Sequence, residues 1–195
     1  WVKDSYNLNS IEIVMTESTN RGNSYNWDPT GTWTGAVSNL WSVAGNWSGL
    51  GGATPGAGDD LVFPAGLVSG IYSTNNDIAA GTSFRSIDIQ ETGYILAGNS
   101  ITLGTGNMTA SFASGGAATI SFNIIFGATR TITVTNSGAT LTISGVISGG
   151  AGDGLTKAGA GTLVLSGANT YPGATTINGG ILSVSALANG GAASN

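Results

Sequence analysis

The sequence predicts an all-β protein that folds as a parallel β-helix (a β-solenoid), and three observations support this prediction. Glycine is abundant, with 33 of 195 residues, whereas charged residues make up only 8%. Short apolar pairs recur about every twenty residues from residue 84 onward. Threonine, serine, asparagine and glycine fill the positions between these pairs, which disfavours long helices. A stack of short β-strands joined by repeated corners satisfies all three observations.

Composition and charge exclude several classes of protein. The formal net charge is −5, and the five basic residues are scattered, so the sequence offers no basic surface for nucleic acid or an anionic membrane. The chain has neither cysteine nor histidine, and therefore lacks disulfides, a thiolate nucleophile and the commonest general base and metal ligand. No apolar run is long enough to span a membrane as a helix. We expect no nucleic-acid partner, no membrane-spanning segment and no cofactor or metal ion.

Residues 1–30 are predicted to form an N-terminal extension with one β-strand. Between residues 10 and 17, apolar Ile11, Ile13 and Met15 alternate with polar residues, which is the period of a strand. The flanks are polar, and a lone strand needs a sheet edge with which to pair. Two alternatives remain open: the strand pairs within its own chain as an end cap, or it adds to the sheet of a neighbouring subunit.

Residues 31–83 are predicted to form a tryptophan-rich cap followed by the first irregular coils. Clustered tryptophans suit a plug at the end of a core, because the ring covers apolar surface while its N–H reaches a partner. An exposed aromatic platform for carbohydrate is the alternative. The adjacent acids Asp59 and Asp60 point to opposite faces if they lie in a strand, so we expect them to cap turns rather than share one substrate. The tryptophans expected in the cap are Trp27, Trp33, Trp41 and Trp47.

Residues 84–195 are predicted to form regular coils. Two series of apolar residues run through this region, and each predicts an inward-facing ladder, with threonine and serine outside and about 4.8 Å between stacked strands. Left-handed backbone conformations are expected at the corners, which are formed by Asn99-Ser, Gly106-Asn, Asn136-Ser-Gly, Asn169 and Asn178-Gly-Gly. The first series is Ile101, Ile120, Leu141, Leu163 and Leu182; the second is Phe112, Ile132, Leu155 and Ile177; the corner asparagines are Asn99, Asn107, Asn136, Asn169 and Asn178.

The most regular stretch of the chain lies at residues 154–188. It contains the pattern Lys-x-Gly-x-Gly-Thr-Leu-x-Leu-Ser-Gly-x-Asn-Thr-Tyr, beginning at Lys157 and ending at Tyr171. This pattern resembles the autotransporter-associated β-strand repeat, also called the passenger-associated transport repeat. The tryptophan-rich segment at 33–63 resembles the leader that often precedes such repeats. The resemblance implies a right-handed parallel β-helix, an extracellular or cell-surface location in a bacterium, and no intrinsic catalysis.

The acids of the periodic region give no support to an enzyme. Parallel β-helix enzymes need acids or a base that converge on one face. Here Asp88, Glu91 and Asp153 are not one coil apart on a common face, and Arg130 and Lys157 have no carboxylate at a matching position. We therefore expect no catalytic residues.

Two hypotheses for function follow. The first is a non-enzymatic structural subunit that self-associates end to end into a surface fibre or layer, by donating its N-terminal strand to the last coil of the next copy. The alternative is an adhesin, a passenger stalk or a carbohydrate-binding module with surface glycans as partners. Either a complete small subunit or a fragment of a larger passenger fits the sequence. The expected subunit contacts are Ile11, Ile13, Met15, Ile181, Leu182 and Val184.

Overall fold

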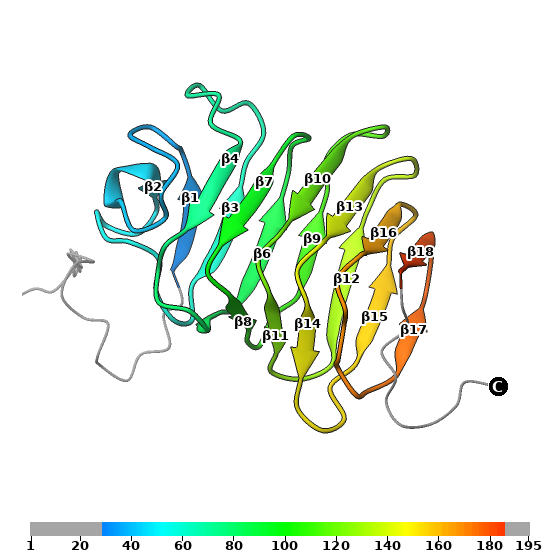
Figure 1. The fold of residues 1–195 in the computed structure, drawn as a ribbon. Helices are drawn as coiled ribbons and strands as arrows, with labels where there is room; N and C mark the ends of the chain where they lie inside the picture. Colours follow the sequence, from blue (N-terminus) through cyan, green and yellow to red (C-terminus); the bar gives the residue numbers. More distant parts are fainter. Residues whose placement is uncertain (1–28, 186–195) are drawn as a thin grey trace, which may run out of the picture.

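The computed structural model describes residues 29–185, and these form a β-solenoid in which the chain winds through three sheets (Figure 1). The only helical segment in this range is a 3₁₀ turn, η1 (Ala44–Asn46). No helix in the same range has the length and hydropathy needed to cross a membrane. The predicted strand at residues 10–17, with Ile11, Ile13 and Met15, lies outside the described residues, as does Trp27.

Between residues 60 and 165 successive strands visit the three sheets in turn, and we call one such passage a coil; the last two strands skip the third sheet. Strands of successive coils pair in parallel, and the exception is the antiparallel pair β1–β2. The first sheet contains β1 (Thr30–Trp33), β2 (Trp47–Ser48), β3 (Asp60–Phe63), β6 (Ser86–Ile89), β9 (Met108–Ala110), β12 (Arg130–Val134), β15 (Leu155–Ala158) and β17 (Thr175–Ile177). The second contains β4 (Ser73–Asn76), β7 (Ile95–Gly98), β10 (Ala117–Ile120), β13 (Thr140–Ile143), β16 (Thr162–Leu165) and β18 (Ile181–Val184). The third contains β5 (Thr82–Phe84), β8 (Ile101–Leu103), β11 (Ile124–Phe126) and β14 (Ile147–Gly149).

The core follows from the alternation of side chains along each short strand. In β16, Leu163 and Leu165 are fully buried, while Thr162 and Val164 alternate with them on the outer face. Each buried aliphatic side chain contributes about 1.5–3 kcal/mol, and the backbone hydrogen bonds continue from coil to coil. The prediction of an all-β parallel β-helix is confirmed.

The predicted ladders are correct in one part and wrong in another. Leu141, Leu163 and Leu182 are aligned as predicted. Ile120, however, aligns with Ile143, and Ile101 belongs to the third sheet. An apolar pair two residues apart offers two equivalent registers, and corners of unequal length decide between them.

The second predicted ladder contains a buried charge that the apolar pattern did not show. Ile132 aligns with Lys157, which in turn aligns with Ile177. Leu155 aligns instead with Arg130 in the preceding coil. Phe112 is buried but lies outside the strands, between β9 and β10.

The left-handed conformations predicted at the corners occur at glycines, including Gly138 and Gly180 of two predicted corners, and at none of the asparagines. In residues 29–185 every residue with positive φ is a glycine. The asparagines act through their side chains, because corner backbone groups lack partners within the sheets. Asn99 donates from Nδ2 to the carbonyl of Ile78 (2.8 Å), and Asn136 donates to that of Phe112 (2.7 Å).

Candidate functional site

The N-terminal end of the solenoid is closed by a cluster of three tryptophans, Trp33, Trp41 and Trp47. Trp33 and Trp41 are completely buried, and Trp47 is 6% exposed. Trp47 packs edge to face against both others, with ring centroids 5.1 Å from Trp33 and 5.7 Å from Trp41. Phe63 of β3 lies under the cluster, 5.5 Å from Trp41, and joins it to the core. Such edge-to-face pairs add about 0.5–1.5 kcal/mol each beyond their burial.

Each indole N–H of this cluster has an internal acceptor. Trp33 donates to the carbonyl of Ile71 (3.0 Å), Trp41 to Oγ1 of Thr74 (2.9 Å), and Trp47 to the carbonyl of Trp41 (2.9 Å). The rings therefore present no face to solvent on which a sugar could stack. For these three residues the alternative of an exposed aromatic platform has no support, and Trp27 lies outside the described range.

The loop that carries the cluster is organised by Asn46, a residue that the sequence did not single out. Asn46 is completely buried, and its Oδ1 accepts hydrogen bonds from the backbone N–H groups of Val37 (2.8 Å) and Ser38 (2.9 Å). Its Nδ2 donates to the carbonyl of Leu40 (2.7 Å), and Leu40 bridges to Asn75 of β4. The loop thereby covers the first strand of the second sheet, while antiparallel β2 covers that of the first sheet. Two of the three sheets are therefore covered at this end, while β5 of the third sheet pairs with β8 alone.

The opposite end is not covered within the described residues. There β17 and β18 pair on one side only, with β15 and β16 (Figure 1). Leu182 and Val184 of β18 are only partly buried, in contrast to the fully buried leucines of β16 with which they align. Ile177 is 55% exposed and Ile181 60% exposed. We call these four residues, Ile177, Ile181, Leu182 and Val184, the C-terminal end face.

The acids predicted to cap turns have different roles. Asp59 is buried and accepts from the backbone N–H of Gly56 (2.7 Å), as predicted for a turn cap. Asp60 instead forms an ion pair with Arg85 of the next coil, which donates from Nε to Oδ1 (2.9 Å) and also from its terminal nitrogen. Ser86 also donates to Asp60. The sequence could not show this pairing because it depends on the register between β3 and β6.

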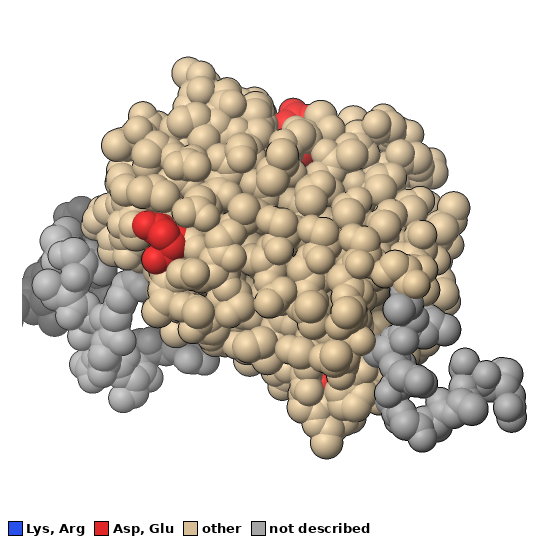
Figure 2. All heavy atoms as spheres, in the orientation of Figure 1, with Lys and Arg blue, Asp and Glu red and all other residues tan. Residues whose placement is uncertain are grey.

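Acidic side chains do not converge elsewhere in the part of the chain that the structure describes. No three of them lie close enough to hold a metal ion. On the face shown in Figure 2 they lie far apart, and no basic side chain is visible. Asp77 links the tryptophan-rich loop to β4, accepting from the backbone N–H of Ser42 (2.8 Å) and from its hydroxyl. Partial burial acts to raise the pKa of Asp77, but the hydrogen bonds from Ser42 outweigh it and lower that pKa below its ordinary value.

Two basic side chains are buried in the corners and bind backbone carbonyls. Arg130 is 8% exposed and donates to the carbonyls of Leu103 (3.2 Å) and Thr105 (3.1 Å) in the preceding coil. Lys157 is fully buried, and burial lowers the pKa of its ammonium group from the ordinary value. The sequence showed only that these residues lack carboxylates at matching positions.

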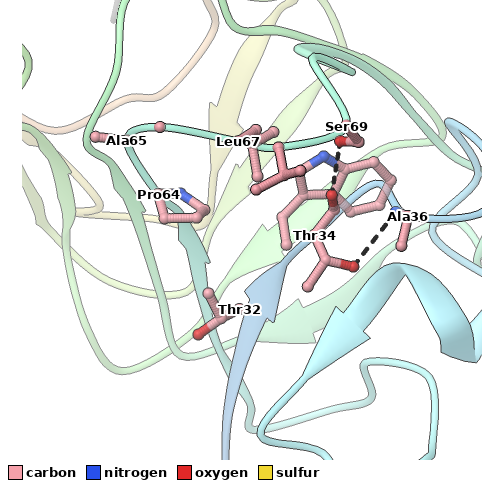
Figure 3. A pocket seen from close by; sticks show the side chains of 10 residues that line it. Thr32, Thr34, Ala36, Pro64, Ala65, Leu67 and Ser69 are labelled. Carbon is pink, nitrogen blue, oxygen red and sulfur yellow. Dashed lines mark hydrogen bonds between the residues drawn. The ribbon is translucent and has the colours of Figure 1, made fainter.

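A shallow hollow of about 450 Å³ lies beside the end of β1 and the loop that follows β3 (Figure 3). Two of its polar side chains already have backbone partners: Oγ1 of Thr34 accepts from Ala36 (3.4 Å), and Ser69 donates to the carbonyl of Thr34 (2.8 Å). No charged side chain lines it, so it lacks the convergent polar groups of a specific ligand site. The lining residues are Thr32, Trp33, Thr34, Ala36, Pro64, Ala65, Gly66, Leu67, Val68 and Ser69.

Comparison with known proteins agrees with the architecture. Residues 155–184 match the family model of the passenger-associated transport repeat. The chain is 33% identical over 193 residues to a protein described as the adhesin BmaC autotransporter of Brucella suis biovar 1 (strain 1330). The match covers 96% of this chain but spans only 5% of the length of that protein. No solved structure matches significantly. Residues 155–184 are thus a passenger-associated transport repeat, and the chain that carries them is a β-solenoid of a bacterial cell-surface or secreted protein.

Proposed function

We propose that this chain is a non-enzymatic structural segment of a bacterial surface protein, and that its C-terminal end face accepts a further β-strand. The supporting observation is the difference between its two ends. The N-terminal end is closed by β2 and the tryptophan cluster, whereas β17 and β18 have one unpaired edge each within residues 29–185. An unpaired parallel edge with apolar side chains is a template for strand addition.

The proposed strand is residues 10–17 of a second copy of the chain. In this arrangement Ile11, Ile13 and Met15 continue the inward ladder of Leu182 and Val184, while Ile181 lies on the outer face of β18, in line with Thr162. The copies join end to end into a fibre or layer. The first strands of two of the three sheets are covered at the N-terminal end, which disfavours direct stacking of folded coils and supports a contact made by a strand from the extension.

The sequence offers such a strand at a suitable distance. The twelve residues between position 17 and β1 span up to about 40 Å when extended. The three predicted parts then have separate roles: residues 1–30 donate the strand, residues 31–83 close one end, and residues 84–195 form the coils that accept.

Two variants separate the donor from the acceptor. A chain that lacks residues 1–26 keeps the C-terminal end face but has no strand to give, and Leu182→Lys keeps the strand but places a charge on the inward side of the acceptor. Ile125→Lys is the matched control, because Ile125 is 39% exposed but lies on the side wall, in β11.

Light scattering coupled to size-exclusion chromatography, and negative-stain microscopy, measure the assemblies. We expect the full chain and Ile125→Lys to assemble with rising concentration, and both other variants to remain monomeric alone. When these two variants are mixed, the strand of the charged variant should pair with the intact acceptor of the truncated chain. Assembly should stop at this heterodimer, because it has neither a free donor strand nor an uncharged acceptor. A full chain that stays monomeric at high concentration, or a truncation that leaves the size distribution unchanged, refutes strand donation.

A second candidate, a stalk segment of an adhesin, is favoured by the name and length of the relative from Brucella suis. In that case the strand on the C-terminal end face comes from a further coil of the same polypeptide. Glycan-array binding by the full chain, with tryptophan fluorescence as a second readout, tests whether the segment itself recognises sugar. A pure stalk segment binds none, whereas a saturable glycan signal assigns it to recognition.

A further inference from the structure

Lys157 is a buried cation without a carboxylate partner among the described residues. It occupies the inward-facing ladder between Ile132 and Ile177 and has 0% exposed surface. Its Nζ donates three hydrogen bonds, all to backbone carbonyls: Ala158 (2.7 Å), Gly159 (2.9 Å) and Gly179 (3.1 Å). An ammonium group has three N–H donors and no acceptor, so this set satisfies it completely. Its charge is balanced by carbonyl dipoles rather than by an acid.

The three carbonyls converge because glycines let two corners touch backbone to backbone. Gly159 has φ of 77°, and a Cβ there would lie 2.2 Å from the carbonyl oxygen of Val134 in the preceding coil. At Gly180, with φ of 64°, a Cβ would lie 2.2 Å from the carbonyl oxygen of Gly161. Side chains are therefore excluded from this column, and the buried oxygens in it need a donor that reaches from another position. The four-carbon stem of Lys157 provides that reach.

The direction of these bonds sets Lys157 apart from two other donors, Asn136 and Arg130, and is shared by smaller polar side chains such as Asn76 and Ser114. Asn136, in the equivalent corner one coil earlier, donates back to Ser111 and Phe112. Arg130 also binds carbonyls of the coil before it. Lys157 alone of these three donates forward, to Gly179, and so joins the corner between β15 and β16 to the corner between β17 and β18.

We propose that Lys157 is a clamp that holds the coil formed by β17 and β18 in place. Apolar burial does little for this coil, because all three residues of β17 are exposed and β18 is only half buried. The ammonium bond to Gly179 supplements the sheet ladders at the corner that links the two strands. In the repeat motif, the lysine is the donor and the glycines form its cage. This inference is independent of strand donation, since it concerns how a single copy keeps its last described coil.

The clamp makes a prediction about chemical rescue. Lys157→Ala removes the stem and the ammonium group but leaves the three carbonyls, which form a site for a small alkylammonium ion. Propylammonium carries three N–H donors and an apolar tail of the missing length. Tetramethylammonium carries the same charge without a donor, and propanol carries the tail without the charge.

Hydrogen–deuterium exchange of the full chain, followed by mass spectrometry, reports each coil separately. Lys157→Met keeps the volume of the stem and should raise exchange in residues 175–185 by about tenfold or more, with β10 and β13 unchanged. Propylammonium should restore protection in Lys157→Ala, whereas tetramethylammonium and propanol should not. Unchanged exchange in Lys157→Met overturns the clamp. So does a rise spread evenly over all coils, or equal rescue by all three compounds.

Discussion

Replacement of equivalent leucines in neighbouring coils measures how exposed the last coil is in solution. Leu163 and Leu182 occupy the same ladder, one coil apart, in β16 and β18. Leu163 is fully buried between Leu141 and Leu182, whereas Leu182 is half buried and has a coil on one side only. A fully buried leucine replaced by alanine costs about 2–5 kcal/mol, through lost transfer energy and the cavity that remains. We expect about 3 kcal/mol for Leu163→Ala and about 1 kcal/mol for Leu182→Ala.

Urea unfolding of the dilute full chain, followed by tryptophan fluorescence, gives both free energies of unfolding. Fluorescence reports from the closed end, so it follows loss of the whole solenoid, and exchange at residues 181–185 follows the last coil. The two leucine replacements should not disturb the packing of the tryptophan cluster directly, because each coil contacts only its neighbours. Equal costs for the two leucines would mean that β18 is already covered in the monomer, and the argument for an open acceptor end would fail.

Three further predictions concern single contacts. Trp41→Phe should lower the free energy of unfolding by about 1–2 kcal/mol, because it leaves Oγ1 of the buried Thr74 without its donor; Thr74→Val in the same background should recover part of that loss in urea titrations. Asp77 has a lowered pKa, so the stability that it contributes is complete above its unfolded pKa and is lost as pH falls through the folded pKa. Ser42→Ala should flatten this loss of stability in acid, and an unchanged pH dependence would exclude the pair. Burial, with the charges of Tyr72 and Glu91, raises the pKa of Tyr94 far above its ordinary value. The unfolded chain therefore loses the tyrosine proton first, and the free energy of unfolding falls as pH rises past about 10. Tyr94→Phe should remove this alkaline loss, at a cost of about 1 kcal/mol at pH 7 for the hydrogen bond to the carbonyl of Pro64.

The fold could be predicted because the apolar residues of each coil recur at a regular spacing along the sequence. Leu141, Leu163 and Leu182 recur at nearly constant spacing, and only stacked coils bury all of them together. The register was not predictable in the same way. Ile120 and Phe122 are both buried and two residues apart, so the pattern allows either to lie in the ladder. The length of each corner makes that choice, and corner length is set by glycine conformations that a spacing rule does not include.

The polar core positions were harder still to predict from the sequence. Asn46 and Lys157 are residue types that normally lie at the surface, and each is buried because it satisfies several backbone groups at once. The relevant groups come from segments brought together only by the fold: Val37 to Leu40 for Asn46, and Gly179 for Lys157. Lys157 also interrupts an otherwise apolar ladder, which is why the second predicted series skipped it in favour of Leu155.

The two ends of this solenoid are stabilised by different means, and the difference bears on how a surface structure grows. Aromatic burial with satisfied indole N–H groups closes the N-terminal end within the chain itself. At the other end, backbone pairing and one buried ammonium group hold a coil whose apolar side chains remain half exposed. Polar contacts of this kind keep the strand edges of the last coil aligned even though no further coil packs on it. The edges are then already in position to pair with an added strand. In the arrangement that we propose, the next strand adds to the edges of β17 and β18, whether it belongs to a second copy or to the same polypeptide.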